Sequence, residues 1–479
     1  MVGWHGGVIH DEGKETARAE PWLGVVEKGT EFFATAQIAA CARRTGCVRR
    51  TSKLTGKVFL ALVTGGTWSL AKTSLAQLAA TGAQLPTPGD CSPDALPQRM
   101  TPRAVAFLRE VLRRAFANLH TDHKGCDDGL LAAFTAVHSA DSTGLALPAP
   151  LTDGFPGKGG GARVAGAKIQ LVWEYLRHSF AHLALGPGTT PANTYIDTVV
   201  RVAQRGAWLL FDLGSFTRKA LAQSAEAEAY FLTRHHQQAA LFETVAGRVR
   251  PVELAAGFRP EPQRLRESPL SLGARERVAV RLIAARGPDA VVNARRRKAR
   301  KAARKRGYPP SQAPLTRLAG TLFIPNVPRT VWPPATLGKA DSLRWQVELV
   351  FKSWNSDLPL APFPTKPQTP TLCSLYGRLV LIVLPSALCP ALRTVLWNRQ
   401  PRELRFLNLL RYLQALADRW LQTLFASTAT LRPFLAQICV SAQRVIAKAS
   451  RRRRTSAQRL RESLETQTDV IKLTIKLAA

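Results

Sequence analysis

The sequence predicts an α/β fold in which helices cover a central sheet, and three observations support this class. Stretches at 134–141, 168–173, 207–211 and 229–233 have the apolar or alternating pattern of strands. Helix-like segments alternate with these strands, which is typical of layered α/β proteins. Hydrophobic residues make up 46% of the 479 residues, so the chain has enough apolar side chains for a large core and is not disordered throughout.

The N-terminal part of the chain is expected to be helical. Residues 1–30 give no assignment and lack the unbroken apolar core of a secretory signal. Residues 31–130 show helical spacing, and Thr101 followed by Pro102 predicts that one helix begins there. A candidate phosphate-contacting surface in this region consists of Arg43, Arg44, Arg49, Arg50, Lys53 and Lys57. The alternative is an ordinary solvated helical face.

Two aspartates follow predicted strands in residues 131–236, the first part of the α/β core. We expect the strand over 134–141 to end in a turn at 142–144, and the strand over 207–211 to stop at Asp212. This would place Asp141 and Asp212 at the carboxyl ends of strands, where the ligands of such sheets gather. Asp197 is a rival for the second acidic position, but it lies within a predicted helix.

Residues 237–330 are predicted to be a β-rich insertion that carries a basic helix. Strand-like pieces occur at 243–253, 278–286 and 318–324. Residues 295–306 place nine positive charges in twelve positions, and a helix that is basic on all sides cannot face a core. It is therefore either solvated or placed against phosphates. The DNA contacts assigned to it are Arg295, Arg296, Arg297, Lys298, Arg300 and Lys301.

The charge balance indicates a polyanionic partner. Sixty-seven Lys and Arg against 33 Asp and Glu give a net charge of +34, far more than solubility requires, so nucleic acid is the expected partner. The seven cysteines form no Cys-x-x-Cys pair, which excludes a zinc knuckle and a thioredoxin-type site and fits a reducing cytoplasm. The apolar run 379–384 meets Pro385 well before the ~20 residues that a membrane span needs, so no membrane association is expected.

A long helix is predicted near 340–358. Projected at about 100° per residue, its apolar side chains form one buried stripe: Leu343, Val347, Val350, Phe351, Trp354 and Leu358. Four polar residues lie together on the edge of that stripe: Asp341, Arg344, Glu348 and Asn355. Spacing alone also fits a surface salt bridge, worth about 0.3–0.5 kcal/mol.

The two aspartates, the glutamate on this helix and the strong positive charge together predict a phosphoryl-transfer site with two metal ions. Mg²⁺ prefers carboxylate oxygens and water as ligands. Two such ions about 3.5–4 Å apart can activate the attacking oxygen and stabilise the leaving one. Neither histidine nor cysteine ligands are needed.

Four segments carry a resemblance to a known family: 139–143, 210–216, 230–234 and 343–352. With them, the sequence resembles bacterial insertion-sequence transposases of the IS-four type over about residues 55–479. That family has an Asp-Asp-Glu triad on an RNase-H-like (retroviral-integrase-like) core.

The resemblance implies cleavage and strand transfer at the terminal inverted repeats of an insertion sequence, by a cut-and-paste route. The expected partners are double-stranded DNA and a second copy of the chain, in the bacterial cytoplasm at the nucleoid. Asp141, Asp212 and Glu348 would be the catalytic triad and would hold two Mg²⁺ ions, for which Mn²⁺ can substitute. Arg344, Lys352 and Arg234 would contact DNA.

The same resemblance divides the chain into regions. Residues 331–365 would return to the RNase-H-like core after the insertion. Residues 366–479 would form a helical region for dimerisation and DNA contact.

The sequence departs from the family signature at three positions. Asp341 stands at the Tyr position, Asn355 at the Lys position, and Gly320 where members carry a Trp. An extra carboxylate would repel the DNA phosphate, so these departures predict impaired strand handling, as in a degenerate copy. Two alternatives stay open: an RNase-H-like nuclease that cuts without joining, and a catalytically dead protein that binds the inverted repeats.

Overall fold

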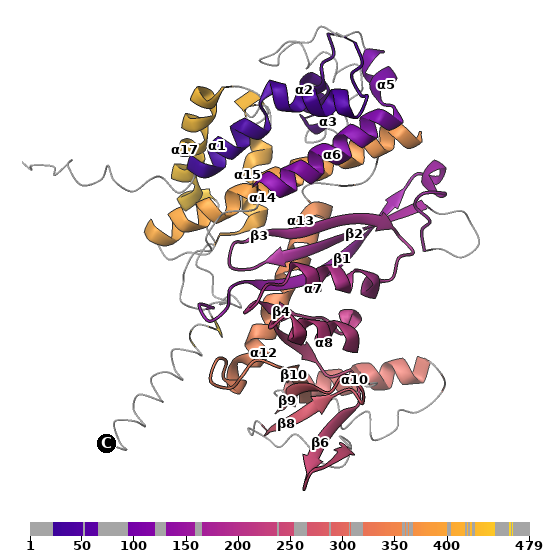
Figure 1. The fold of residues 1–479 in the computed structure, drawn as a ribbon, viewed down its shortest axis with the longest axis vertical. Coiled ribbons are helices and arrows are strands. Elements are labelled where there is room, and N and C mark those ends of the chain that lie inside the picture. The colour runs from indigo at the N-terminus through magenta and orange to yellow at the C-terminus, as the bar shows by residue number, and fades with distance from the viewer. Residues whose placement is uncertain are drawn as a thin grey trace, which may run out of the picture. The chain divides into compact units, whose positions relative to one another are not determined.

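In the computed structural model the chain forms two compact units (Figure 1). The first unit contains Met1–Ser69, Thr73–His123 and Val380–Lys448, and the second contains Leu70–Lys72, Lys124–Leu379 and Ala449–Ala479. The structure describes residues 23–50, 53–65, 94–119, 131–158, 165–236, 239–252, 266–286, 289–305, 307, 320–356, 360, 363, 367–399, 404–416, 419, 422–423, 427–445, 459–460 and 462.

The named elements of the first unit, among the residues that the structure describes, are helices, as the sequence predicted for its N-terminal part. Its elements are α1 (Leu23–Phe32), α2 (Thr35–Arg44), α3 (Gly56–Gly65), α5 (Ala95–Arg99), α6 (Pro102–Leu119), α15 (Phe406–Ala415), α17 (Thr428–Val445) and most of α14 (Gln368–Arg399). Helix α6 begins at Pro102 as predicted, and the hydroxyl of Thr101 accepts a bond from the Ala104 N–H.

Helix α14 continues through Pro385 and Pro390, so the expectation that proline ends the apolar run is wrong. Each proline removes one helical hydrogen bond, but neighbouring apolar side chains are buried and favour the continuous helix. Over Gln368–Leu396 this helix is long and apolar enough to cross a membrane, but 94% of its most apolar window is buried. Core helices of soluble proteins have the same features, so length and composition alone assign no membrane role.

The second unit is built on one ten-stranded sheet, which confirms the predicted α/β class. The strand order is β3-β2-β1-β4-β5-β10-β9-β8-β6-β7. The bounds are β1 (Val137–Leu147), β2 (Ala165–Glu174), β3 (Ser179–Pro187), β4 (Trp208–Leu210), β5 (Tyr230–Arg234), β6 (Leu241–Val245), β7 (Arg248–Pro251), β8 (Arg266–Leu272), β9 (Val278–Arg286) and β10 (Gly320–Pro325). Strands β1, β4 and β5 are parallel, and the other pairings are antiparallel.

The strands of the predicted insertion extend the core sheet. Strand β10 pairs with β5, with Phe323 opposite Arg234, and β9, β8, β6 and β7 follow outward. The β6–β7 hairpin turns at Ala246 and Gly247, both with positive φ, a conformation that glycine adopts without cost.

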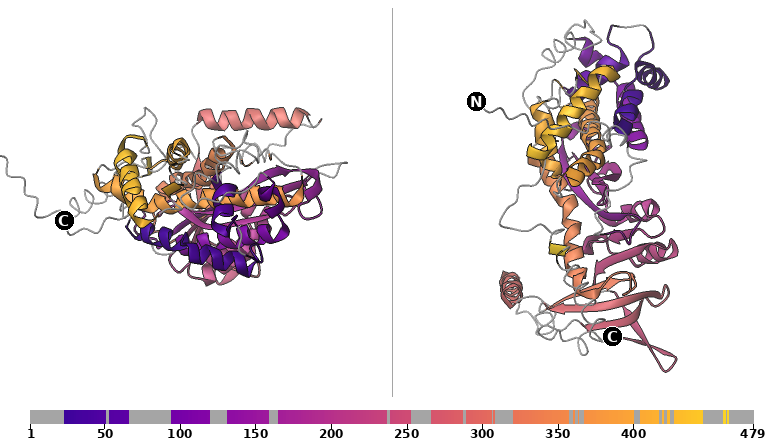
Figure 2. Two further views of the ribbon diagram at one scale, coloured as in Figure 1. Left: turned by 90° about the horizontal axis from the view of Figure 1, so that it is seen from above. Right: turned by 90° about the vertical axis from the view of Figure 1, so that its left-hand side faces the viewer.

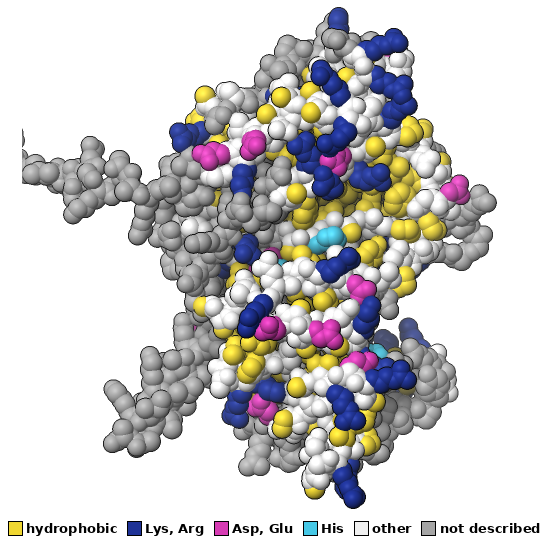
Figure 3. All heavy atoms as spheres, in the orientation of Figure 1, with side chains coloured by type: hydrophobic (Ala, Val, Ile, Leu, Met, Phe, Trp, Pro, Cys, Tyr) yellow, Lys and Arg dark blue, Asp and Glu magenta, His cyan; other side chains and the backbone are white. Residues whose placement is uncertain are grey.

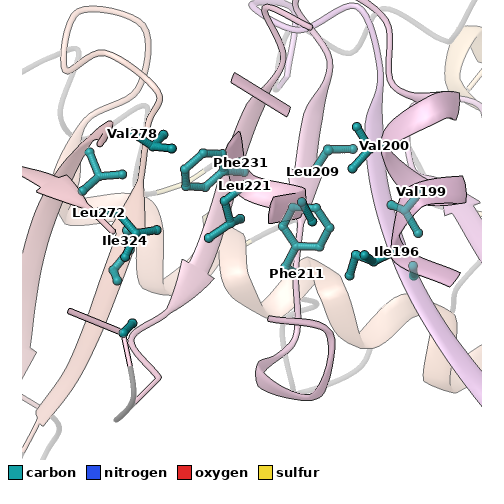
Figure 4. Packing of buried hydrophobic residues seen from close by; sticks show 14 of the residues in the cluster. Ile196, Val199, Val200, Leu209, Phe211, Leu221, Phe231, Leu272, Val278 and Ile324 are labelled. Carbon is teal, nitrogen blue, oxygen red and sulfur yellow. The ribbon is translucent and has the colours of Figure 1, made fainter. Parts of the chain in front are cut away.

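Helices cover the core sheet on both faces. Helices α7 (Ile196–Val202) and α8 (Arg218–Glu226) cover one face, and the core cluster between them and the strands includes Leu209, Phe231 and Ile324 (Figure 4). Helix α13 (Trp345–Ser356) packs against β1 and β2. Side chains alternate along a strand, so Ala140 joins the α7–α8 cluster and Asp141 points to the opposite face, the one that α13 covers.

Strand β1 is longer than predicted. The sequence places a turn at 142–144, but β1 runs to Leu147, so Asp141 lies within the strand and not at its end. Ser142, Thr143 and Gly144 pair with Gln170, Ile169 and Lys168 of β2. Pairing along the whole of β2 outweighs the local turn preference of a Ser-Thr-Gly segment.

Glu174 fixes the turn that follows β2. Its carboxylate is buried and accepts N–H bonds from Val137 (3.1 Å), Leu176 (3.0 Å) and Arg177 (2.6 Å). Glu174→Ala leaves three donors without this acceptor, so we expect a loss of about 3 kcal/mol in the free energy of unfolding. Urea unfolding measures it. The control is Glu228→Ala, because Glu228 is 62% exposed in its pair with Arg205 and should contribute less than about 1 kcal/mol.

Candidate active site

Two neighbouring parallel strands bring Asp141 and Asp212 to the same place. The last paired residues of β1 and β4 are Ser139 and Leu210, and each aspartate lies two residues beyond its member of that pair. Asp212 caps the one-turn helix η3 (Leu213–Ser215) and accepts a bond from the Gly214 N–H at 3.3 Å. The Asp141 carboxylate accepts a 2.7 Å bond from the Ser142 N–H.

Glu348 lies on α13, and the residues just before this helix are wound more tightly than the predicted α-helix. In place of one helix over 340–358, the chain forms α12 (Leu337–Ala340), a 3₁₀ turn η5 (Asp341–Arg344) and then α13. A 3₁₀ helix has three residues per turn, so the projection at 100° does not apply to η5. Asp341 and Arg344, expected at the edge of the stripe, are only 4% and 5% exposed.

The predicted buried stripe of this helix is confirmed where the structure describes it. Leu343, Val347, Val350, Phe351 and Trp354 are all buried. Leu358, the last predicted member, and the side chain of Asn355 lie outside the described residues.

The guanidinium of Arg344 connects two of the three acidic residues. Its Nη1 lies 3.1 Å from Oδ1 of Asp212 and 3.9 Å from Oε1 of Glu348. The Asp212 and Glu348 side chains are 43% and 27% exposed, whereas that of Arg344 is 7% exposed. The site therefore presents carboxylates to solvent above a buried cation.

Asp141 interacts electrostatically with Asp212, Glu348 and Arg344. Burial raises the pKa of Asp141, and the nearby charges of Glu348 and Asp212 raise it further, against the opposing Ser142 N–H and Arg344. Three acidic residues that are up to 207 positions apart in the sequence (348 − 141) thus act on one another in the fold.

This raised pKa predicts how stability depends on pH without divalent ions. The folded-state pKa of Asp141 lies above its unfolded value, so stability is lost as the pH rises through the folded pKa. Asp141→Asn removes this penalty, and we expect it to unfold at a higher temperature than the unmodified chain at pH 7. Thermal unfolding in a chelating buffer measures this. Below about pH 3, where both side chains are neutral, the difference should vanish; a lower Tm for the variant at pH 7 would contradict the coupling.

The donor atoms fit divalent metal ions by their chemistry. Carboxylate oxygens are the ligands that Mg²⁺ and Mn²⁺ prefer, and mutual repulsion among the three acids is relieved when a cation binds. Among the residues that the structure describes, no three Asp, Glu, His or Cys side chains are close enough to form a ready-made metal cluster. The Arg344 guanidinium currently takes the place of a cation between Asp212 and Glu348.

The family model described as the transposase DDE domain matches residues 133–377, slightly more than half of the chain and including all three acids. The chain belongs to the DDE transposase family. Its function is DNA transposition, and it is an enzyme of the polynucleotidyl transferase and endonuclease class. Membership confirms the RNase-H-like core and implies dependence on a divalent metal ion.

Insertion-sequence transposases are similar to this DDE transposase over most of its length. The transposase for insertion sequence element IS231B of Bacillus thuringiensis subsp. berliner is 25% identical, with 76% of this chain and 79% of that protein covered. The transposase for IS1151 of Clostridium perfringens is 22% identical, covering 81% and 86%. The solved piggyBac transposase synaptic complex with hairpin DNA is 10% identical over 92% of this chain and 88% of that one, with a TM-score of 0.45.

The transposase presents most of its predicted DNA contacts on the basic helix α10 (Asp289–Lys305). Val292 and Ala303 are its buried residues. Figure 2 shows the helix set off from the strands of its unit. Exposed cations of this helix are Arg295, Arg297, Lys298, Arg300, Lys301, Arg304 and Lys305. Arg296 is partly buried, and Arg306 lies outside the described residues.

The predicted basic residues of the first unit differ in their surroundings. Arg43 is exposed, and Arg44 forms a 2.6 Å ion pair with Glu110. Lys57 is buried and donates to the Thr35 hydroxyl at 3.2 Å, so its place on a phosphate-contacting surface is wrong. On the face that Figure 3 shows, Lys and Arg side chains (dark blue) are more widespread than Asp and Glu side chains (magenta).

Sequence reasoning missed two features of the transposase site. Trp345 is 47% exposed, and the cations of Arg344 and Lys352 lie 5.7 Å and 5.9 Å from its ring centroid. Its position away from the apolar stripe of the helix could have indicated an exposed aromatic residue. The second feature is the ion pair between Asp341 and Arg234, whose partners are 107 residues apart and which no local pattern predicts.

Proposed function

We propose that Asp141, Asp212 and Glu348 are the catalytic acids of this transposase, and that they hold two Mg²⁺ ions, with Mn²⁺ as a substitute. One observation supports the proposal, namely the mutual proximity of the three acids. Arg344 bridges Asp212 and Glu348, and the charges of both these acids raise the pKa of Asp141. Bound ions would supply a water of lowered pKa as nucleophile and a charge opposite the leaving oxygen.

The other residues of the site bind and orient the DNA strand. Arg344 donates through a planar fork that suits phosphate. Lys352 is exposed one turn after Glu348 and adds a cation on the same helix. The indole face of Trp345 lies next to both cations and offers a surface on which a base can stack.

The basic helix α10, with Arg43 on the first unit, is assigned to the DNA backbone. Its many exposed cations suit contacts to phosphates, which position DNA without reading its sequence. The proposed substrate is the pair of terminal inverted repeats of an insertion sequence, bound by a dimer of this chain in the bacterial cytoplasm.

Cleavage and joining assays test this function. The substrate is a duplex that carries the inverted repeats flanking the coding sequence, incubated with Mg²⁺ and a supercoiled target. Cut repeat ends joined to target DNA are the expected products, and a duplex with a scrambled repeat is the control. Cutting without joined product would leave the chain a nuclease. Binding without cutting, in both Mg²⁺ and Mn²⁺, would leave it a catalytically dead repeat-binding protein.

A further inference from the structure

Asp341 lies inside the protein, next to the candidate active site. It opens the 3₁₀ turn η5 and is only 4% exposed. A buried carboxylate is costly unless opposite charges compensate it. The partners of Asp341 therefore indicate what it does.

Two arginines face Asp341, one at each oxygen. Arg234 donates to Oδ2 from Nη2 at 2.5 Å and from Nε at 3.1 Å. The Nε of Arg344 lies 4.0 Å from Oδ1. Arg234 is the last residue of β5, so the pair links that strand to the segment that leads into Glu348.

Arg344 contacts Asp341 and the acidic triad with different nitrogens. Its Nη1 faces Asp212 and Glu348, and its Nε faces Asp341. Within the described part of the chain this Nε makes no hydrogen bond, so its interaction with Asp341 is the electrostatic attraction to the carboxylate. A guanidinium is planar and rigid, so an attraction at Nε sets the direction in which Nη1 points.

We propose that Asp341 is a positioning residue that turns Arg344 toward the acidic triad from inside the protein, an inference that rests on the proposed function of that triad. Asp341 is buried and paired, so it does not present its charge to DNA. The cluster contains four carboxylates and two guanidiniums, which leaves a net charge of 2 − 4 = −2. Without the charge of Asp341 the attraction at Nε is lost, so Nη1 of Arg344 no longer keeps its direction toward the triad and contacts the phosphate beside it less well.

Single-turnover cleavage in four proteins tests the inference: the unmodified chain, Asp341→Asn, Arg344→Gln and the double variant. Asp341→Asn should lower the rate about 10- to 100-fold, because a misdirected contact group has effects of that order. In the Arg344→Gln background the same change should alter the rate less than about twofold, since its effect acts through Arg344. A purely structural role would not produce this dependence.

Glu267→Gln is the matched control. Glu267 also faces two arginines, Arg281 at 3.3 Å and Arg329 at 3.6 Å, but it lies on β8. Its substitution should leave the rate unchanged in both backgrounds. Asp341→Asn leaves Arg234 without the counter-charge of this carboxylate, which could prevent folding. A second variant that combines Asp341→Asn with Arg234→Gln removes both charges and serves if the first does not fold. An unmodified rate in Asp341→Asn, or the same loss with Arg344→Gln as without it, overturns the inference.

A readout without cleavage separates this inference from the proposed function. The Nε proton of Arg344, identified in NMR spectra by its loss in Arg344→Lys, should exchange with solvent about tenfold faster in Asp341→Asn than in the unmodified chain or Glu267→Gln. Equal exchange in all three refutes the positioning role. If the unmodified chain does not cleave DNA, the proposed function fails, and the exchange rates still decide the inference.

Discussion

Replacing Asp141 with Ala should abolish cleavage of terminal-repeat DNA while leaving DNA binding intact. We expect a rate loss of about 10³-fold or more, which corresponds to about 4 kcal/mol in the activation barrier. The reason is that a proposed metal ligand is removed from the centre of the site. Affinity for uncut repeat DNA should stay within about twofold, because phosphate contacts by Lys and Arg supply most of the binding free energy.

Single-turnover cleavage and equilibrium binding to the same duplex measure the two effects separately. Asp197→Ala is the matched control, because it removes another acidic residue of the same unit, one that lies 49% exposed on α7 with Oδ2 3.4 Å from Lys219. It should cleave at the unmodified rate. Asp212→Asn and Glu348→Gln should behave like Asp141→Ala. Cleavage at an undiminished rate by the Asp141 variant would mean that another set of residues carries the chemistry.

Neutralising exposed cations of the basic helix α10 should strongly weaken DNA binding. The variant carries Gln at four exposed positions of α10: Arg295, Arg297, Arg300 and Arg304. Each phosphate contact that is lost removes about 0.9 from the slope of log affinity against log salt, so the slope should become shallower by about 3 to 4. Affinity near 0.1 M salt should fall by about 10²-fold or more.

A control with the same change of net charge distinguishes local contact from overall charge. Gln at Arg201, Arg205, Arg218 and Lys219 removes four exposed cations from α7, α8 and the segment between α7 and β4. Fluorescence anisotropy over a range of salt concentrations gives both slopes. If α10 lies on the DNA, only its variant should flatten the slope strongly. Equal changes in both variants would show that the helix acts only through the total charge of the chain.

Local patterns predicted several strands to within one residue, because periodicity reports which side chains are buried. Strand β4 was expected at 207–211 and β5 at 229–233. Strand β9 begins and ends at the predicted residues, and the apolar stripe of α13 is buried as expected. Predicted strand ends and the helix projection singled out the three acids, and the family resemblance made them a triad. The fold brings them into mutual electrostatic contact. Their roles are still predictions.

Long-range pairings could not be predicted from the sequence alone. Nothing near 142–144 indicates that β2 will pair with β1 through that segment, and the local composition favoured a turn. Asp341 was expected to lie near DNA because it stands at the Tyr position of the family signature. Its burial depends on the 3₁₀ geometry of η5 and on Arg234, which is distant in sequence.

The pairing of β10 with β5 has a consequence for attempts to shorten this protein. Removing β6 to β10 would turn β5, now an interior strand with Phe231 and Leu232 buried, into an open sheet edge. Open edges with apolar side chains invite other chains to add on and aggregate. The present outer strand β7 is short, fully exposed and carries Arg248, Arg250 and Pro251, features that discourage such addition. We therefore expect that β6 to β10 protect the core sheet against self-association and that a chain without them aggregates.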